Sequence, residues 1–491
     1  MSVPFNNSYV QLPERFYSRQ SPTKVENPGL IRANPGLAKL LGIDPAWLSS
    51  DDGIETMAGN LIPIGADPIA TVYAGHQFGS WNPQLGDGRA ILLGEVIGTN
   101  GQRYDLQLKG AGQTPYSRMG DGRAPLGPVM REYIVSEAMA ALGVPTSRSL
   151  AAVTTGEPVY REEALPGAVL ARVAKSHIRI GTFQFFASKE DKEALGLLVN
   201  HVLERHYPNS VEEGASLNIK ALTLLDEVMK AQAKLVGSWQ MIGFIHGVMN
   251  TDNVLLSGET VDYGPCAFMD TYNPETVFSS IDHGGRYAYR NQPSIAHWNM
   301  ACLAQALVLV MADKEENAIE IAKETLEKFP AYFQDANVSG MQHKLGLATR
   351  HDNDEMLAKD FLGLLEAHQL DFTLSFRRLS ELSGTLPAAN VSSLAGFPSA
   401  FDGWMARWKT RLDAEHNPTR QKDMLNTNPA IIPRNHLIEE SIVAASTEGN
   451  FDLFNELVDN LASPFDLEGI DIRFAKKPKS EQVVRQTFCG T

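Results

Sequence analysis

The chain has 491 residues and a formal net charge of −15. Neutralising phosphates requires a basic surface, so this acidic balance argues against nucleic acid as the main partner, although a local basic site is not excluded. Hydrophobic residues at 43% and charged residues at 21% are ordinary for a globular protein. The first residues lack a basic flank and an apolar core, and the apolar run at 303–312 is too short to span a bilayer. We therefore expect a cytoplasmic monomer without membrane contact.

The first half of the chain predicts strands that follow an extension. Residues 1–60 contain Pro and Asn throughout and predict an extension packed on the next domain. Two glycine-containing stretches, Tyr73–Gly79 and Gln84–Arg89, lead into an aliphatic strand at 90–97. Glycines let backbone N–H groups approach phosphates, but glycine turns between strands are commoner than phosphate-binding loops. Both interpretations stay open.

A strand and a helix predict an ion pair. Residues 103–109 alternate as a strand should and end on Lys109. A loop follows, and then a helix from Pro128 that ends before Gly143 and carries Glu137 near its apolar stripe. In kinases, a strand lysine followed by a helix glutamate forms the pair that orients the lysine on phosphates. We expect Lys109 and Glu137 to form such a pair.

Two further strands are expected at 149–153 and 168–173. Arg172 lies within the second strand, and Arg179 follows shortly after it. An arginine on an otherwise apolar strand must be paired or must serve a phosphate. The residues alone do not decide between a structural salt bridge and a phosphate-binding role.

The stretch His246–Asn253, followed by Asp262-Tyr263-Gly264, is similar to the catalytic segment of protein kinases. Those enzymes carry H-R-D-x-x-x-x-N and then D-F-G. Their first Asp accepts the proton of the attacking hydroxyl, and the Asn and the second Asp bind the metals that bridge the phosphates. Here Asn253 and Asp262 match the metal ligands. Val248 stands where the base is expected, and valine cannot accept a proton.

Two explanations of this segment stay open. The chain binds nucleotide without doing chemistry, or it carries out a different phosphoryl-type reaction with another base, for which Asp252 is the candidate. A chance occurrence of the short motif in a long chain is also to be weighed. The rest of the chain has to decide.

The remaining pattern is helical from residue 188 onward, with long helical stretches at 294–383, 401–412 and 435–461. We predict an α+β, protein-kinase-like two-lobe fold with nucleotide in the cleft. The predicted parts are an N-terminal extension (1–60), a strand-rich N-lobe (61–187), a larger helical C-lobe with the catalytic and metal-binding loops (188–474) and a mobile C-terminal tail (475–491).

Long strings of residues along the chain identify a resemblance to the selenoprotein O family, which includes bacterial YdiU-type proteins. The strings are Gln84-Leu-Gly-Asp-Gly-Arg89, Leu106-Gln-Leu-Lys-Gly-Ala-Gly-Gln-Thr-Pro-Tyr-Ser-Arg118, Gly120-Asp-Gly-Arg-Ala124, His246-Gly-Val-Met-Asn-Thr-Asp-Asn253 and Asp262-Tyr-Gly-Pro-Cys-Ala-Phe-Met-Asp270. The similarity covers essentially the whole chain. It implies a kinase-like protein adenylyltransferase that moves AMP from ATP to Ser, Thr or Tyr hydroxyls of proteins and releases pyrophosphate.

The resemblance also implies a role for each site residue. The nucleotide lies flipped relative to a kinase, so its α-phosphate faces the acceptor. Asp252 would be the base, and Asn253 and Asp262 would carry Mg²⁺ or Mn²⁺. The residues that would line or bind ATP, with Glu137 as the partner of Lys109, are Gly86, Gly88, Arg89, Lys109, Asp121, Gly122, Arg172, Arg179 and Asp262.

The three cysteines, Cys266, Cys302 and Cys489, form neither a disulfide framework nor a zinc site. Cys302 lies in an apolar run and is expected in the core. In bacterial relatives a tail cysteine can bridge to the loop after Asp-Tyr-Gly, so the resemblance implies a Cys266–Cys489 disulfide. Two unrelated thiols are the alternative, because disulfides are unusual in cytosolic proteins.

Three other functions stay open. UMP transfer from UTP with Mn²⁺ would use the same chemistry. A small-molecule phosphotransferase would share His246-Gly247 and Asn253, but Val248 argues against it. A non-catalytic nucleotide-binding scaffold would keep the same metal ligands and the lysine.

Overall fold

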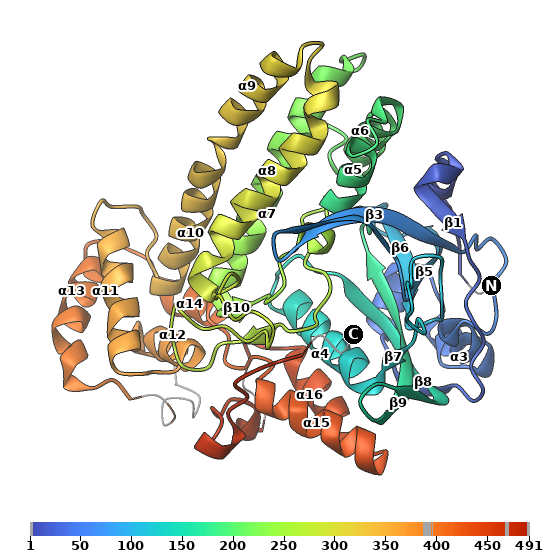
Figure 1. Cartoon of the computed structure of the whole chain (residues 1–491). Coiled ribbons are helices and arrows are strands. Elements are labelled where there is room, and N and C mark those ends of the chain that lie inside the picture. The colour runs from blue at the N-terminus through green and yellow to red at the C-terminus, as the bar shows by residue number, and fades with distance from the viewer. Residues whose placement is uncertain (1–2, 386–393, 395, 467–470, 489–491) are drawn as a thin grey trace.

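The computed structural model describes residues 3–385, 394, 396–466 and 471–488. It combines an antiparallel, strand-rich sheet with a larger helical portion (Figure 1). Within the described residues the main sheet has nine strands, in the order β1-β3-β5-β6-β9-β8-β2, with β4 paired to β3 and β7 paired to β9. The strands are β1 (Tyr17–Arg19), β2 (Gly29–Ala33), β3 (Ile69–Gln77), β4 (Ser80–Gly86), β5 (Ala90–Ile97), β6 (Arg103–Lys109), β7 (Ala124–Pro125), β8 (Arg148–Tyr160) and β9 (Ala164–Ala174).

The N-terminal 60 residues are part of this sheet. Strand β1 pairs with β3, and β2 pairs with β8 at the other end of the strand order. Three short helices, α1 (Pro35–Leu40), α2 (Pro45–Leu48) and α3 (Asp51–Ala58), then place apolar side chains against one face of the sheet. Each begins at a side-chain cap, from Asn34, Asp44 and Ser50 respectively. The predicted extension therefore supplies strands as well as packing.

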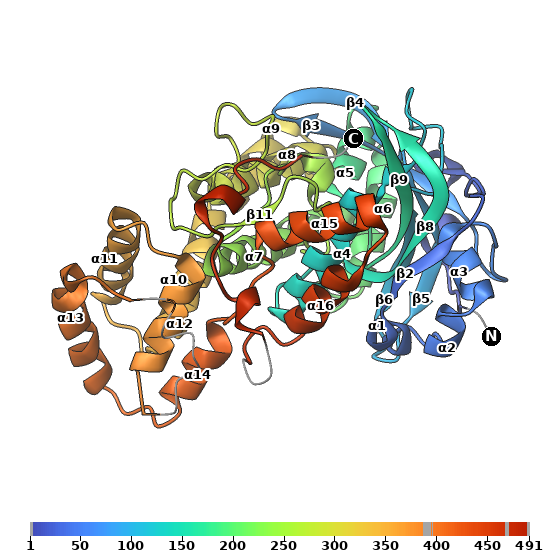
Figure 2. The same ribbon diagram turned by 90° about the horizontal axis from the view of Figure 1, so that it is seen from below.

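Helix α4 (Leu126–Ala141) packs on β8 and β9, and α15 (Asn435–Glu448) and α16 (Asp452–Leu461) pack on α4 (Figure 2). The chain reverses between α15 and α16 at Gly449, whose φ is 66°. This turn divides the single helical stretch that was expected at 435–461. Residues from the end of the chain thus support the helix that lies against the sheet.

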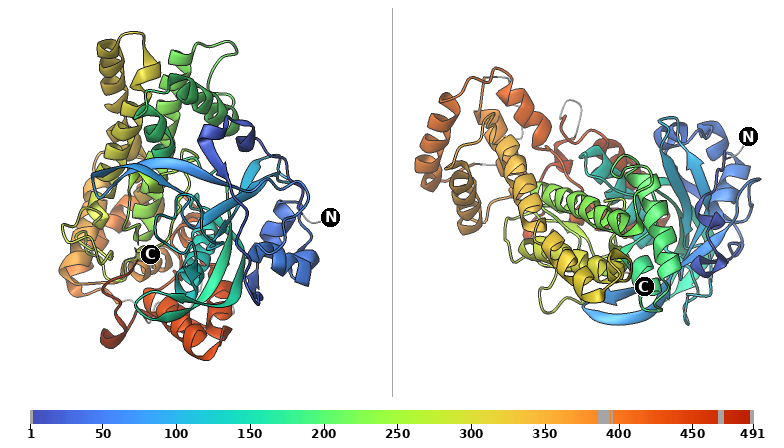
Figure 3. Two further views of the ribbon diagram at one scale, coloured as in Figure 1. Left: turned by 45° about the vertical axis from the view of Figure 1, so that its right-hand side comes forward. Right: turned by 90° about the horizontal axis from the view of Figure 1, so that it is seen from above.

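The helical portion extends away from the sheet, as both views of Figure 3 show. Its long helix α7 (Leu217–Ile242) packs against α8 (Gln292–Met311) and α10 (Phe329–Leu345). The segment 294–383 is helical as predicted, in five helices. The remaining helices are α5 (Ile180–Ala187), α6 (Lys192–His206), α7 (Leu217–Ile242), α8 (Gln292–Met311), α9 (Glu315–Leu326), α10 (Phe329–Leu345), α11 (Asp354–Ala367), α12 (Phe372–Leu382), α13 (Asp402–Asp413) and α14 (Arg420–Thr427).

One helical stretch among the described residues, Tyr289–Met311, is long and apolar enough by composition to cross a membrane. It is weak evidence for a membrane span, because buried core helices pass the same test. Helix α8, which makes up most of the stretch, packs against α5, α7 and α9. Its apolar residues belong to the largest core cluster, which also includes residues of α4 and the sheet.

Candidate active site

Two cations and two carboxylates form a closed ring of ion pairs. Lys109 Nζ lies 2.6 Å from Glu132 Oε2 and 3.0 Å from Asp262 Oδ1. Arg172 Nη1 donates to the same Asp262 oxygen at 2.7 Å and to Glu132 Oε1 at 3.2 Å. All four side chains are largely buried, and Asp262 is the most exposed of them at 22%.

Each member of the ring comes from a different element. Lys109 ends β6, Arg172 lies on the neighbouring β9, Glu132 lies on α4, and Asp262 lies in the loop between β10 (Phe244–Ile245) and β11 (Ala267–Phe268). The register of β6 and β9 places Gln107 opposite Arg172, whose Nη2 donates to Gln107 Oε1 at 2.6 Å. Asp262 has a φ of 61°, which is uncommon for a residue with a Cβ atom. The ion pairs hold it in this conformation.

The prediction that Lys109 pairs with Glu137 is wrong, because its helix partner is Glu132. Glu137 accepts hydrogen bonds from Arg148 Nε at 2.9 Å and from the Ser149 N–H at 2.8 Å. Five residues turn an α-helix by about 500°, so the two glutamates face directions roughly 140° apart. Helix α4 is buried on almost all sides, so its apolar stripe does not identify the face that meets Lys109.

Arg179 joins this site from the residue that precedes α5. Its Nη1 lies 3.5 Å from Asp262 Oδ2 and donates to the backbone carbonyl of Asp252 at 2.8 Å. The guanidinium lies 4.5 Å from the centre of the Tyr73 ring. Its Nη2 is buried and has no hydrogen-bond partner within the described part of the chain. The structure therefore brings together Lys109, Arg172, Arg179 and Asp262, which the family resemblance had implied to share a site; their roles toward nucleotide and metal stay predictions.

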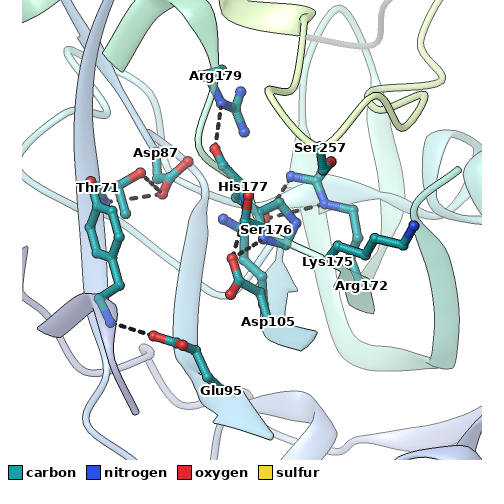
Figure 4. A network of polar contacts seen from close by, with 12 residues as sticks. Thr71, Asp87, Glu95, Asp105, Arg172, Lys175, Ser176, His177, Arg179 and Ser257 are labelled. Carbon is teal, nitrogen blue, oxygen red and sulfur yellow. Dashed lines mark hydrogen bonds and ion pairs between the residues drawn. The ribbon is translucent and has the colours of Figure 1, made fainter. Parts of the chain in front are cut away.

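A buried histidine and carboxylate hold the Arg179 segment (Figure 4). Arg179 Nε donates to the His177 carbonyl at 3.2 Å. The His177 N–H donates to Asp105 Oδ2 at 2.8 Å, and Nδ1 lies 3.0 Å from the same oxygen. Burial lowers the pKa of His177, so its ring is neutral at pH 7. These contacts fix the backbone from which Arg179 reaches the site.

The cations control the ionisation of the two carboxyl groups in the ring. Burial alone would raise the pKa of Asp262, but Arg172, Lys109 and Arg179 hold it well below its usual value. Burial likewise opposes ionisation of Glu132, and Lys109 and Arg172 outweigh it and lower the pKa. Both groups are therefore ionised at neutral pH.

Glu259, three residues before Asp262, behaves in the opposite way. Its Oε2 accepts hydrogen bonds from the Lys175 N–H at 2.9 Å and from Ser257 Oγ at 2.8 Å. Burial raises the pKa of Glu259 from 4.5 to about 7. Because this pKa is raised on folding, the folded protein binds more protons than the unfolded chain between pH 4.5 and about pH 7. Stability linked to this group is present at low pH and is lost as the pH rises through 7.

We expect Glu259→Gln to raise the free energy of unfolding at pH 8 by roughly 3 kcal/mol, since one pKa unit corresponds to about 1.4 kcal/mol. The amide oxygen can accept the same two hydrogen bonds and carries no charge. At pH 4.5 the variant and the wild type should be nearly equal. Denaturant unfolding at both pH values measures the difference, and an equal effect at both would contradict the assignment.

The residues that the sequence predicts to form a catalytic loop lie between β10 and β11. Asp252 is 8% exposed, and its Oδ2 accepts a hydrogen bond from Gln77 Nε2 at 3.0 Å. Its Oδ1 is buried without a partner among the described residues, and burial raises its pKa. Asn253 Nδ2 donates to the Val248 carbonyl at 2.9 Å. His246 Nε2 lies 2.9 Å from the Val261 carbonyl, so His246 ties this loop to the segment that leads into Asp262.

The glycine-rich segment forms the β3–β4 hairpin, with Phe78 and Gly79 both at positive φ in its turn. Gly86 is the last residue of β4 and Gly88 follows the hairpin, and both lie against Tyr116. A Cβ atom at Gly86 would lie 2.3 Å from the Tyr116 ring, and one at Gly88 would lie 2.8 Å from the Tyr116 carbonyl oxygen. Packing alone therefore accounts for both glycines, and their contact with nucleotide stays a prediction.

The other predicted nucleotide residues have structural partners as well. Arg89 is half-buried, and its carbonyl accepts a hydrogen bond from the Gly110 N–H at 2.7 Å. Asp121 forms an ion pair with Arg161 at 2.8 Å. Gly122 has a φ of 69°, and a Cβ atom there would lie 2.1 Å from the backbone of Gly112. Neither the Asp121–Arg161 ion pair nor the packing of Gly122 against Gly112 joins the ion-pair ring.

The donor set fits a hard divalent cation. Mg²⁺ usually binds one or two protein carboxylates together with substrate phosphates and water. Asp262 supplies a carboxylate, and Asn253 has an amide oxygen left after its Nδ2 has bonded to Val248. No group of three or more His, Cys, Asp or Glu side chains in the described part of the chain could hold a metal ion. Such an ion would therefore complete its coordination with oxygens from the nucleotide or from water.

The C-terminal tail runs beside the loop that follows Asp262. Thr487 Oγ1 donates to the Pro265 carbonyl at 2.6 Å, and the Thr487 N–H donates to the Phe278 carbonyl at 2.8 Å. Cys266, next to Pro265, is buried. Cys489 lies outside the described residues, so the Cys266–Cys489 disulfide stays a prediction.

Comparison with known proteins places the chain in a family. Residues 1–462 match the family model described as protein adenylyltransferase SelO. The chain is 55% identical over 490 residues to a protein nucleotidyltransferase YdiU of Rhodopseudomonas palustris (strain BisB18), with 99% of each chain covered. It is 54% identical over 490 residues to the protein nucleotidyltransferase YdiU of Bradyrhizobium sp. (strain ORS 278), again with 99% of each chain covered. The chain belongs to the SelO family of protein adenylyltransferases.

Proposed function

We propose that the chain transfers AMP from ATP to Ser, Thr or Tyr hydroxyls of acceptor proteins. The observation that carries this proposal is the convergence of three cations, Lys109, Arg172 and Arg179, on the carboxylate of Asp262. The buried Nη2 of Arg179 has no hydrogen-bond partner among the described residues. A nucleotide phosphate would satisfy this donor, because guanidinium groups match phosphate geometry.

A protein-kinase-like arrangement of two lobes is part of the proposal. Residues 61–187 would form the N-lobe and residues 188–474 the helical C-lobe, with ATP between them. A strand lysine paired with a helix glutamate, ahead of a loop with Asn253 and Asp262, supports this analogy. The analogy concerns architecture, and the function rests on the site residues.

Asn253 and Asp262 would hold Mg²⁺ or Mn²⁺ together with the phosphates. The ion would offset charge on the phosphate oxygens when bound. Its ligands come from the loop between β10 and β11, whose ends are paired as Phe244–Phe268 and Ile245–Ala267. This short pair of strands fixes the distance between the two ends of the loop.

The reaction is an in-line displacement at the α-phosphorus. The acceptor hydroxyl loses its proton to Asp252, its oxygen bonds to the α-phosphorus, and the bond to pyrophosphate breaks. Lys109, Arg172 and Arg179 would stabilise the negative charge that develops on pyrophosphate. Val248 occupies the position of a kinase base and cannot take the proton. A flipped nucleotide moves the reacting phosphorus, so the base must move as well, and Asp252 is a buried carboxylate beside Asn253.

Mass spectrometry of an acceptor protein tests the proposal against its alternatives. The protein is incubated with ATP or UTP and with Mg²⁺ or Mn²⁺, and the acceptor is weighed intact. We expect a mass gain of one adenylyl group with ATP. A uridylyl gain from UTP alone would favour UMP transfer, and phosphorylation of small alcohols would favour a phosphotransferase. Nucleotide binding without any product would favour a scaffold.

A further inference from the structure

The β3–β4 hairpin covers two charged groups, each of which has buried polar atoms without a hydrogen-bond partner among the described residues. Asp252 Oδ1 and the Nε and Nη2 atoms of Arg286 are buried and have no partner among the residues described. Burying part of a charged group without a hydrogen bond is unfavourable, so such groups need a physical explanation. A ligand that bonds to both groups during the reaction would provide one.

The hairpin has a glycine beside each of these groups, and the glycine at Gly75 allows its close approach to Asp252. A Cβ atom at Gly75 would lie 2.9 Å from Asp252 Oδ1, and one at Gly79 would lie 3.9 Å from Arg286 Cζ. Gln77, between the two glycines, donates to Asp252 Oδ2 at 3.0 Å. The hairpin therefore lies over both the proposed base and the guanidinium of Arg286.

Few bonds hold the hairpin tip on the catalytic loop. Besides Gln77, the His76 N–H donates to Thr251 Oγ1 at 2.7 Å, and the Phe78 N–H donates to Asn250 Oδ1 at 2.9 Å. Together these three hydrogen bonds join the hairpin tip to Asn250, Thr251 and Asp252. Figure 1 shows the β3 ribbon extending from the sheet to the helical portion, where its end meets this loop. Lifting the tip would expose the carboxylate of Asp252.

The Arg286 side chain is positioned so that one edge of its guanidinium can bind an acidic group. Its backbone N–H donates to Asp282 Oδ1 at 2.9 Å, and its guanidinium lies 4.7 Å from the centre of the Trp298 ring. Nε and Nη2 together form the edge of a guanidinium that makes two parallel bonds to a carboxylate. The next residue, Tyr287, donates through its hydroxyl to Asn250 Oδ1 at 2.7 Å. Arg286 is thus joined to the loop two residues from the proposed base.

We propose that the space beneath the β3–β4 hairpin is the acceptor site and that Arg286 selects the acceptor. The acceptor hydroxyl donates to Asp252, and an Asp or Glu side chain near it in the acceptor protein forms a two-bond pair with Arg286. The hairpin rises to admit the acceptor segment. The ATP phosphates lie at Lys109, Arg172 and Arg179, so Arg286 remains available for the acceptor. This inference rests on the proposed nucleotidyl transfer.

Peptide acceptors with one hydroxyl test the proposal on the full-length protein. Each peptide carries Glu, Gln or Lys at one position near the hydroxyl, and transfer from α-labelled ATP is measured. We expect the wild type to prefer Glu over Gln at one position by roughly 10- to 100-fold in kcat/KM, as for hydrogen bonds to charged groups. Arg286→Met keeps an apolar stem against Trp298 and should remove the preference. Arg286→Glu should favour Lys at the same position.

ATP affinity of the variants distinguishes the acceptor role from other roles. Both variants should bind ATP with wild-type affinity, which also shows that they are folded. A wild type without preference, a preference that survives in Arg286→Met, or weakened ATP binding would overturn the proposal. Absence of α-label on any acceptor with the wild type would overturn the proposed function, and this inference with it.

Discussion

Replacing Asp252 with alanine is expected to lower nucleotidyl transfer by about 10²–10⁴-fold, the usual effect of removing a general base. ATP affinity should change little, because the carboxylate contacts Gln77 and the hairpin, and none of the cations contacts its oxygens. The carbonyl that Arg179 binds belongs to the backbone and remains in the variant. Rate measurements with α-labelled ATP and equilibrium binding of ATP separate the two effects.

Asp252→Asn is the matched control for this experiment. Asparagine keeps the size of the side chain and can accept the Gln77 hydrogen bond through its amide oxygen, but it cannot take a proton. We expect the same loss of transfer as with alanine. Wild-type turnover by either variant would show that the base is another group and that the proposed mechanism is wrong.

Glu132→Gln is expected to lower transfer by about 10²-fold, as misplacement of a positioned group by about 1 Å can do. Glu132 holds both Lys109 and Arg172, at 2.6 and 3.2 Å. The glutamine keeps the shape and loses the charge that fixes these two cations. The largest part of the effect should fall on kcat, because the cations stabilise charge that develops as pyrophosphate leaves.

Glu137→Gln on the same helix is the matched control. Glu137 pairs with Arg148 at 2.7 Å and accepts the Ser149 N–H, so its replacement should lower stability and leave the transfer rate close to that of the wild type. The transfer rate and the thermal stability of both variants are measured and compared with those of the wild type. A larger loss of transfer in Glu137→Gln than in Glu132→Gln would contradict the pairing in the structure.

Much of the fold could be predicted from periodicity. The strands at 90–97 and 103–109 have the predicted bounds, and 294–383 is helical. Helix α14 (Arg420–Thr427) was missed because it lies in a stretch rich in Pro and Asn. The strands β1 and β2 were missed because each is short and pairs with residues far along the chain, which no local pattern records.

The site, like the fold, could be predicted only in part, because some of its contacts depend on how distant segments pack. Motif order pointed to Lys109 and Asp262, the family resemblance added Arg172 and Arg179, and the structure places all four together. The choice between Glu132 and Glu137 depends on the rotation of α4 against the sheet, and a helix buried on nearly every side hides that rotation. The hydrogen bond from Gln77 to Asp252 could not be predicted, because it depends on the register of a hairpin that lies 175 residues away in the chain.

The central claim, nucleotidyl transfer with the α-phosphate facing the acceptor, has a direct test. Purified protein is incubated with a generic acceptor protein, Mg²⁺ or Mn²⁺, and ATP labelled either at the α- or at the γ-phosphate. Label on the acceptor from the α-position, with none from the γ-position, is the predicted result. Label from the γ-position alone would mean phosphorylation by a base other than the one assigned, and the flipped nucleotide would be wrong.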